Sequence, residues 1–275
     1  AAFEKMISDE SIDKAFKSYL LTLPSENYFT QEMLPPDFDA IRSVRSGLVK
    51  KIGLAFQNWF LSKHTELCKV RGFELTPEAY GARALKNQCL SFLAASATDE
   101  GFIRLNEQYK SASNMTEEIH ALTLFIRSGV GLEHESVVGF YKKWKHDSLV
   151  MLKWFSALAA NTPKGEALKT IENLEKDPLF KKDVPNYLRA LYVTFAKSNL
   201  TAFHAEDGSG YAYVAEKIKL LDSFNPQVAS RAATSFSLIK RVDAKRASAM
   251  KAALTKIKEG KPSRDTFEVV SKYLA

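Results

Sequence analysis

Histidine is the residue best suited to bring metal chemistry to this sequence, but its spacing argues against a local zinc site. A zinc peptidase needs two histidines one helical turn apart and a glutamate, as in H-E-x-x-H, because that spacing directs both imidazoles at one ion. His134 and Glu135 have Val138 where the second histidine would stand. The other histidines are well separated: His64, His120, His146 and His204. The sequence therefore predicts no metal ligands and no catalytic residues in this chain.

The segment 203–211 is the most polar and least helix-like part of the C-terminal half. His204, Glu206 and Asp207 could form a metal or acid–base site if their side chains met. The alternative is a loop whose carboxylates cap helix ends and hold a domain contact. We favour the loop, because nothing in this spacing imposes convergence on one ion. The sequence also has no P-loop, no G-x-S-x-G and no G-x-G-x-x-G.

The elements that must position these residues are predicted to be helices. Cap residues followed by proline, which mark helix starts, occur at Thr76-Pro77, Thr162-Pro163, Asp177-Pro178 and Asn225-Pro226. Apolar residues then recur at helical spacing, as in Val228, Ala232, Phe236 and Ile239. Only 12 Gly and 9 Pro leave little material for the turns of an all-β fold. We expect about twelve or thirteen helices with short connections.

A succession of such helices without a long linker predicts one all-α domain over residues 1–275. We expect a curved stack of antiparallel helix pairs, like the superhelix of HEAT or armadillo repeats, in which each pair buries its apolar face against its neighbours. The sequence has no strict period, so the repeat would be structural. A compact irregular bundle is the alternative, since it obeys the same packing rules.

Charge and hydropathy limit the partners that we expect. The net charge is +7, but the basic residues are scattered among acids without a basic arm, so we predict no nucleic-acid partner. The longest apolar stretches, such as residues 90–97, are far shorter than the roughly 20 residues of a membrane span. Cys68 and Cys89 form no C-x-x-C, and we expect both to be buried thiols in a reducing, cytoplasmic compartment.

Several motifs in one order resemble a known family. AFHAEDGSGY at 202–211 and NPQVASR at 225–231 resemble the C-terminal region of the zinc aminopeptidases of the aminopeptidase N family. The match continues at 240–246 and 250–254, and upstream at 23–26, 84–87, 89–91, 114–116, 149–151 and 153–155. The resemblance therefore covers nearly the whole chain.

The resemblance implies that this chain is part of a larger zinc aminopeptidase. In that family, other domains carry the zinc and the general-base glutamate, and the C-terminal helical domain closes over them and forms a channel for peptides. The expected partners are then the catalytic domains of the same polypeptide and peptide substrates. We expect no cofactor in this chain. The resemblance implies that the full-length enzyme binds zinc. The absent zinc motif and missing initiator Met favour a fragment, which we expect to be inactive alone.

By the same resemblance, Arg189, Gln227 and Arg231 match family positions that face the zinc-site cavity and bind the peptide. Arginine offers a cationic fork for peptide carbonyls or a carboxylate, and glutamine both donates and accepts. Gln227 and Arg231 are four residues apart on one predicted helix, so both lie on one face. The residues just before Arg189 depart from the family pattern. The alternative is that either arginine pairs with a carboxylate of its own domain.

Two other functions compete with this interpretation. A free-standing helical-repeat scaffold would bind another protein in its concave surface. A helical nucleic-acid binder would need a continuous basic stripe, which the scattered charge does not provide.

Overall fold

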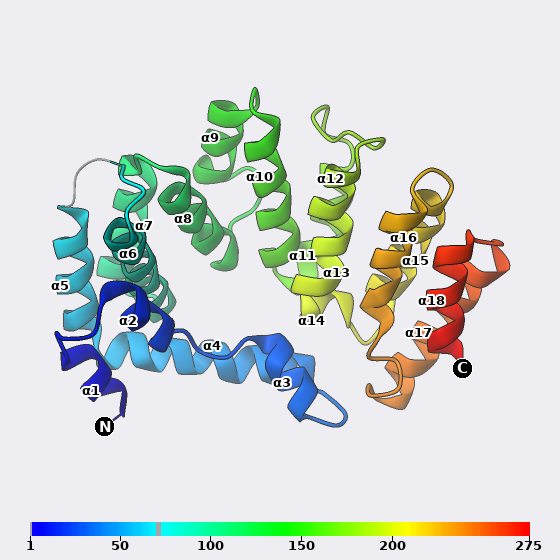
Figure 1. Cartoon of the computed structure of the whole chain (residues 1–275), viewed down its shortest axis with the longest axis horizontal. Helices are drawn as coiled ribbons and strands as arrows, with labels where there is room; N and C mark the ends of the chain where they lie inside the picture. Colours follow the sequence, from blue (N-terminus) through cyan, green and yellow to red (C-terminus); the bar gives the residue numbers. More distant parts are fainter. Residues whose placement is uncertain (1, 70–72) are drawn as a thin grey trace. The chain divides into compact units, whose positions relative to one another are not determined.

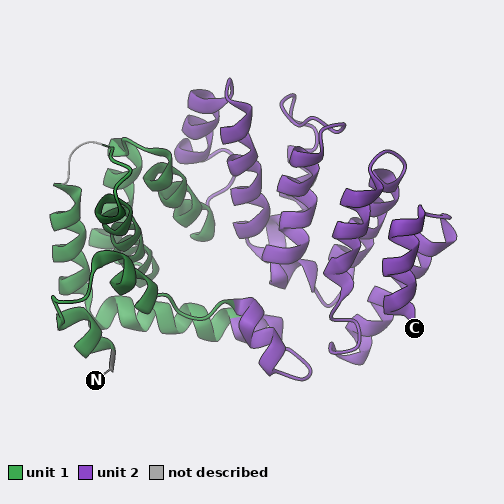
Figure 2. Cartoon of the chain, viewed as in Figure 1, with its two compact units in different colours: residues 1–25, 42–128 green, residues 26–41, 129–275 purple. Residues whose placement is uncertain are grey.

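The computed structural model describes residues 2–69 and 73–275, and every regular element in these ranges is a helix (Figure 1). Contacts divide the chain into two compact units, which are coloured separately in Figure 2. Unit 1 comprises residues 1–25 and 42–128, and unit 2 comprises residues 26–41 and 129–275. No helix within the described ranges combines the length and apolar character needed to cross a membrane.

Unit 1 is built around α6. Its helices are α1 (Ala2–Ser8), α2 (Lys14–Leu20), most of α4 (Phe38–Ala55), α5 (Gln57–Cys68), α6 (Pro77–Ser96), α7 (Asp99–Ser111) and α8 (Met115–Arg127). α2, α5, α7 and α8 all pack against α6. The buried core includes Phe60 from α5 and Leu85 and Phe92 from α6, and the rings of Phe60 and Phe92 stack at 4.6 Å.

Unit 2 continues as a series of packed helices. It contains α3 (Glu26–Glu32), the start of α4, α9 (Glu135–Trp144), α10 (Ser148–Asn161), α11 (Lys164–Leu174), α12 (Pro185–Leu188), η1 (Arg189–Val193), α13 (Thr194–Ser198), α14 (Leu200–Phe203), α15 (Ser209–Asp222), α16 (Pro226–Ala233), η2 (Thr234–Phe236), α17 (Ala244–Glu259) and α18 (Arg264–Leu274). The structure has more helices than the twelve or thirteen predicted. One reason is that residues 185–203 form four short elements in succession: α12, a π-helical turn (η1), α13 and α14.

The segment 26–41 is early in the sequence but belongs to unit 2, with which it makes several polar contacts. Asn27 donates to the carbonyl oxygen of Lys197 at 3.3 Å. Arg241 donates to the carbonyl oxygen of Gln31 at 2.6 Å, and Lys164 pairs with Asp39 at 2.8 Å. These contacts hold α3 and the first residues of α4 against unit 2.

Two of the four predicted cap-and-proline starts are confirmed. The Thr76 hydroxyl accepts from the N–H of Ala79, and the Asn225 side chain accepts from the N–H of Val228, in both cases with proline as the first helical residue. α11 instead begins at Lys164 without a side-chain cap. Asp177 caps only a turn, in which its Oδ1 accepts from the N–H of Leu179 at 2.8 Å. The prediction of a helix start there is wrong, because the turn is not followed by helical backbone.

Both cysteines are free thiols. Cys89 is buried, as expected, but Cys68 is exposed. The expectation for Cys68 fails because it is the last residue of α5, where the chain leaves the helix.

Candidate functional site

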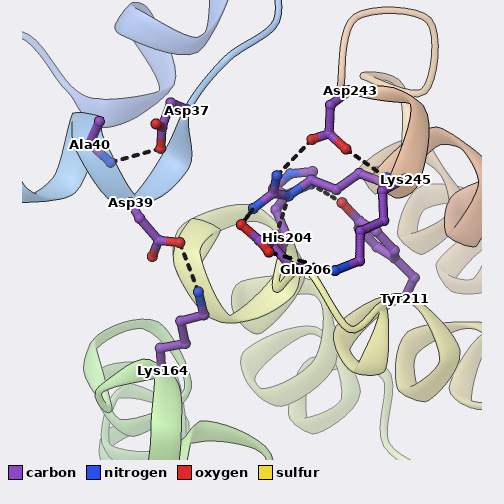
Figure 3. A network of polar contacts seen from close by, with 10 residues as sticks. Asp37, Asp39, Ala40, Lys164, His204, Glu206, Tyr211, Asp243 and Lys245 are labelled. Atoms are coloured by element: carbon purple, nitrogen blue, oxygen red, sulfur yellow. Dashed lines mark hydrogen bonds and ion pairs between the residues drawn. The ribbon is translucent and has the colours of Figure 1, made fainter.

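The loop at 203–211 is a structural junction (Figure 3). The ring of His204 stacks on Phe38 at 3.9 Å, and its Nδ1 lies 2.8 Å from the hydroxyl of Tyr211. Arg246 donates to the carbonyl oxygen of His204 at 2.7 Å and pairs with Asp243 at 2.6 Å. The network therefore joins the start of α4 to α14, α15 and α17.

The three candidate groups of this loop point to different partners. Glu206 faces Lys245 and Arg246 at 3.6 and 3.7 Å. Asp207 accepts from the backbone N–H and the hydroxyl of Ser209 at 3.0 and 2.7 Å, at the start of α15. Across the described ranges, no three or more His, Cys, Asp or Glu side chains are grouped so that they could hold a metal ion. The carboxylate of Asp207 thus bonds to the first residue of α15, that of Glu206 faces the cations of α17, and Gly208, the N-cap of α15, gives no side-chain cap.

Burial first, and then the positive charge of Arg246, lower the pKa of His204 to about 3. The unfolded chain takes up this proton below about pH 6.5, whereas the folded protein does not until far lower pH. The stabilising contribution of neutral His204 is therefore fully present above pH 6.5 and is lost as the pH falls from 6.5 towards 3.

We expect the free energy of unfolding to fall about 2 kcal/mol more between pH 7 and pH 5 in the wild type than in His204→Gln, because the variant has no proton to exclude. Urea unfolding at the two pH values measures this difference. An equal fall in both proteins would show that His204 does not carry the acid sensitivity.

The predicted peptide-contact residues lie on a different part of unit 2. Gln227 and Arg231 are both exposed on α16, while Val228, Ala229 and Ala232 on its other side are buried. Asn225 and Pro226 fix the start of this helix, so the four-residue spacing places both polar side chains on one face as predicted.

Arg189 lies on an element that packs against α16, which the sequence did not reveal. It is exposed and begins the π-helical turn η1, which packs against α16. The carbonyl oxygen of Arg189 accepts from the hydroxyl of Thr194 at 3.1 Å. Such π-turns are rare and frequently occur at functional sites.

Lys197 joins these residues, and sequence reasoning missed it. It lies on α13 and its side chain is exposed. Partial burial lowers its pKa, and the positive charge of Arg231 lowers it further. Because the charge of Arg231 contributes to this shift, we group Lys197 with the predicted residues. We call Arg189, Lys197, Gln227 and Arg231 the cationic surface.

The cationic surface has no negative partner in the part of the chain that the structure describes. Arg189, Lys197 and Arg231 form no ion pair with any described carboxylate, in contrast to Arg246 with Asp243. The alternative was that either arginine pairs with a carboxylate of its own domain. No described carboxylate forms such a pair. Exposed guanidinium groups without a counter-ion can bind carboxylates or peptide carbonyl oxygens.

Comparison with known proteins gives matches over the whole length. The family model described as a domain of unknown function (DUF3458_C) with ARM repeats matches residues 1–275. Aminopeptidase N of Escherichia coli is 35% identical over 275 residues, which are all of this chain and 31% of the relative. Aminopeptidase N of Haemophilus influenzae is 34% identical over 95% of the chain and 30% of the relative. The chain therefore spans about a third of the length of the curated relatives it matches.

A solved structure shares the fold. The crystal structure of Legionella pneumophila aminopeptidase A in complex with aspartic acid matches with a TM-score of 0.89 and 24% identity, over 99% of this chain and 33% of that one. Together with the ARM repeats of the family description, the helices confirm the predicted all-α repeat fold. The relatives confirm the resemblance read from the motifs.

Proposed function

This chain belongs to the family described as a domain of unknown function (DUF3458_C) with ARM repeats, and from that premise we propose that it is the non-catalytic C-terminal domain of a zinc aminopeptidase. Such an enzyme removes N-terminal amino acids from peptides. The observation that carries the proposal is that 95–100% of the chain matches about a third of each Aminopeptidase N relative. The reaction would then belong to the part of the polypeptide outside this match.

The residues described here do not fit a catalytic zinc site. Such a site takes three protein ligands and a water, and no group of three potential ligands forms within the described ranges. We therefore assign the zinc of the whole enzyme, and the chemistry it supplies, to the other domains. These domains would be the main partner of this chain.

The role of this chain would be to form part of the wall of the peptide channel. Arg231 and Arg189 would donate to peptide carbonyl oxygens or to the carboxylate at the far end of the peptide, and Lys197 would add positive charge beside them. Gln227 would adjust selectivity, because its amide both donates and accepts. The absence of ion pairs from the cationic surface supports this role, since these groups are not already engaged by described carboxylates. A cytoplasmic location, which the free thiols Cys68 and Cys89 support, is part of the proposal.

We expect the isolated 275-residue chain to hydrolyse no aminoacyl amide or peptide, with or without added Zn²⁺, while the full-length polypeptide hydrolyses both. Release of free amino acid, measured at equal molar concentration of the two proteins, tests this. Circular dichroism of the isolated chain serves as the control for folding. Hydrolysis by the isolated chain that a chelator abolishes would contradict the proposal.

A further inference from the structure

A histidine and a cysteine stand one turn apart at the end of α5 in unit 1. His64 is 1% exposed, whereas Cys68 is exposed. The Nδ1 of His64 lies 3.7 Å from the Sγ of Cys68. Both are ligands that soft metal ions prefer, and the four-residue spacing places them on one face of the helix.

The hydrogen bonds behind His64 fix which of its nitrogens carries the proton. Its Nε2 lies 3.0 Å from Oε1 of Gln108. The orientation of that amide is set because its Nε2 donates to Oδ1 of Asn87 at 2.8 Å and to the carbonyl oxygen of Glu117 at 3.2 Å. Oε1 of Gln108 must then accept, so His64 donates from Nε2. The lone pair of Nδ1 is left facing the sulfur of Cys68.

This arrangement has the features of a metal-binding pair. A ligating histidine characteristically donates its other N–H to a fixed acceptor, as His64 does to Gln108. A tetrahedral ion with a sulfur ligand at about 2.3 Å and a nitrogen ligand at about 2.0 Å would hold the two ligand atoms about 3.5 Å apart. The observed 3.7 Å is within a small side-chain adjustment of that separation.

We propose that His64 and Cys68 form a binding site for a thiophilic d¹⁰ cation, with Zn²⁺ and Cd²⁺ as the ions to test. Cys68 is an exposed residue at the end of α5, and this gives an ion access to the pair. Because no third ligand gathers here within the described ranges, water or a small solute completes the coordination. The bound ion therefore exchanges readily, unlike the ion of a closed four-ligand structural site.

The positive charge near the two ligands opposes the binding of a cation only in part. Burial raises the pKa of the Cys68 thiol, while the positive charge of Lys86 lowers it. The ammonium of Lys86 is itself paired with Glu117 at 2.9 Å, which balances its charge. The metal must displace the thiol proton, as metals do at cysteine sites generally. Cys89, which is buried in the core of the same unit, offers an internal thiol outside the site.

The test uses the full-length protein and the rate at which iodoacetamide alkylates Cys68, followed by peptide mass spectrometry with and without buffered Cd²⁺. We expect Cd²⁺ to slow alkylation of Cys68 about tenfold or more, because a metal-bound sulfur is a poor nucleophile. His64→Gln should reduce this protection to less than about twofold. Thr65→Ala, an exposed change on the same helix, should retain it.

A second measurement does not depend on the folding of His64→Gln. In equilibrium dialysis, Cys68→Ser should bind one Cd²⁺ fewer per chain than the wild type, since serine at this exposed residue removes the sulfur ligand. Unchanged alkylation of Cys68 in wild-type protein with Cd²⁺, or equal protection in His64→Gln, would overturn the site. These results leave the proposed peptidase role untouched, because none of them measures peptide hydrolysis.

Discussion

Replacing Arg231 by alanine in the full-length polypeptide is expected to lower kcat/KM for tripeptides roughly 10- to 100-fold. A hydrogen bond to a charged group contributes about 1.5–3 kcal/mol, and about 1.4 kcal/mol corresponds to a tenfold change in rate. Arg231 is exposed, has no ion pair with a described carboxylate and stands on the same face as Gln227. Its guanidinium is therefore not engaged within this chain, and the proposed role assigns it to the peptide. Initial rates with a tripeptide and with an aminoacyl amide measure the effect.

The comparison of substrates and variants separates peptide binding from a general loss of activity. The aminoacyl amide lacks the distal part of the peptide, so its kcat/KM should change less than about threefold. Arg231→Lys should restore part of the tripeptide activity, since lysine keeps the charge but not the fork. Arg264→Ala, at an exposed arginine of α18 with only a surface pair to Glu268, should leave both activities unchanged. Equal losses on both substrates with Arg231→Ala would contradict a peptide-binding role.

Gly101→Ala is expected to destabilise unit 1 by about 2–3 kcal/mol. Gly101 lies in the first turn of α7, where this helix meets α6. A Cβ at this position would lie 2.9 Å from the carbonyl carbon of Leu93 and closer still to its oxygen. The obstacle is backbone, so relief requires the two helices to separate, and overpacking of this kind typically costs about 1–3 kcal/mol. Urea unfolding of the variant and the wild type gives the difference.

Gly165→Ala is the matched control. Gly165 also lies in the first turn of a helix, α11, but a Cβ there would meet nothing within 4 Å. Alanine restricts the unfolded chain and favours helix, so this variant should be more stable than the wild type by about 0.4–1 kcal/mol. A similar fall in stability for both variants would show that the close approach of α7 to α6 is not the cause.

The sequence predicted best where the determinants are local. Asn225-Pro226 identified the start of α16, because a capping side chain and a proline act within one turn. That start also placed Gln227 and Arg231 on one face. Asp177-Pro178 offered the same local signal, yet the chain forms only a turn there. A capping residue favours the start of a helix, but the helix persists only if the following residues are stabilised by packing.

What the sequence could not reveal depends on packing between distant segments. Lys197 on α13 is grouped with the cationic surface because the charge of Arg231 on α16 contributes to its lowered pKa, and no spacing rule connects these positions. The π-helical turn at Arg189 arises where η1 packs against α10 and α16. Nothing in the local sequence distinguishes Gly101 from another helical glycine, because its constraint is the backbone of Leu93 on α6. Tertiary contacts, and not propensity, decided each case.

The most direct test of the account is the size of the native polypeptide in the source cells, measured by immunoblot with an antibody against this chain. We expect a band several times larger than 30.8 kDa, as for a domain that forms about a third of its protein. A band at 30.8 kDa without a larger species would contradict it, since the chain would then stand alone as a helical-repeat scaffold.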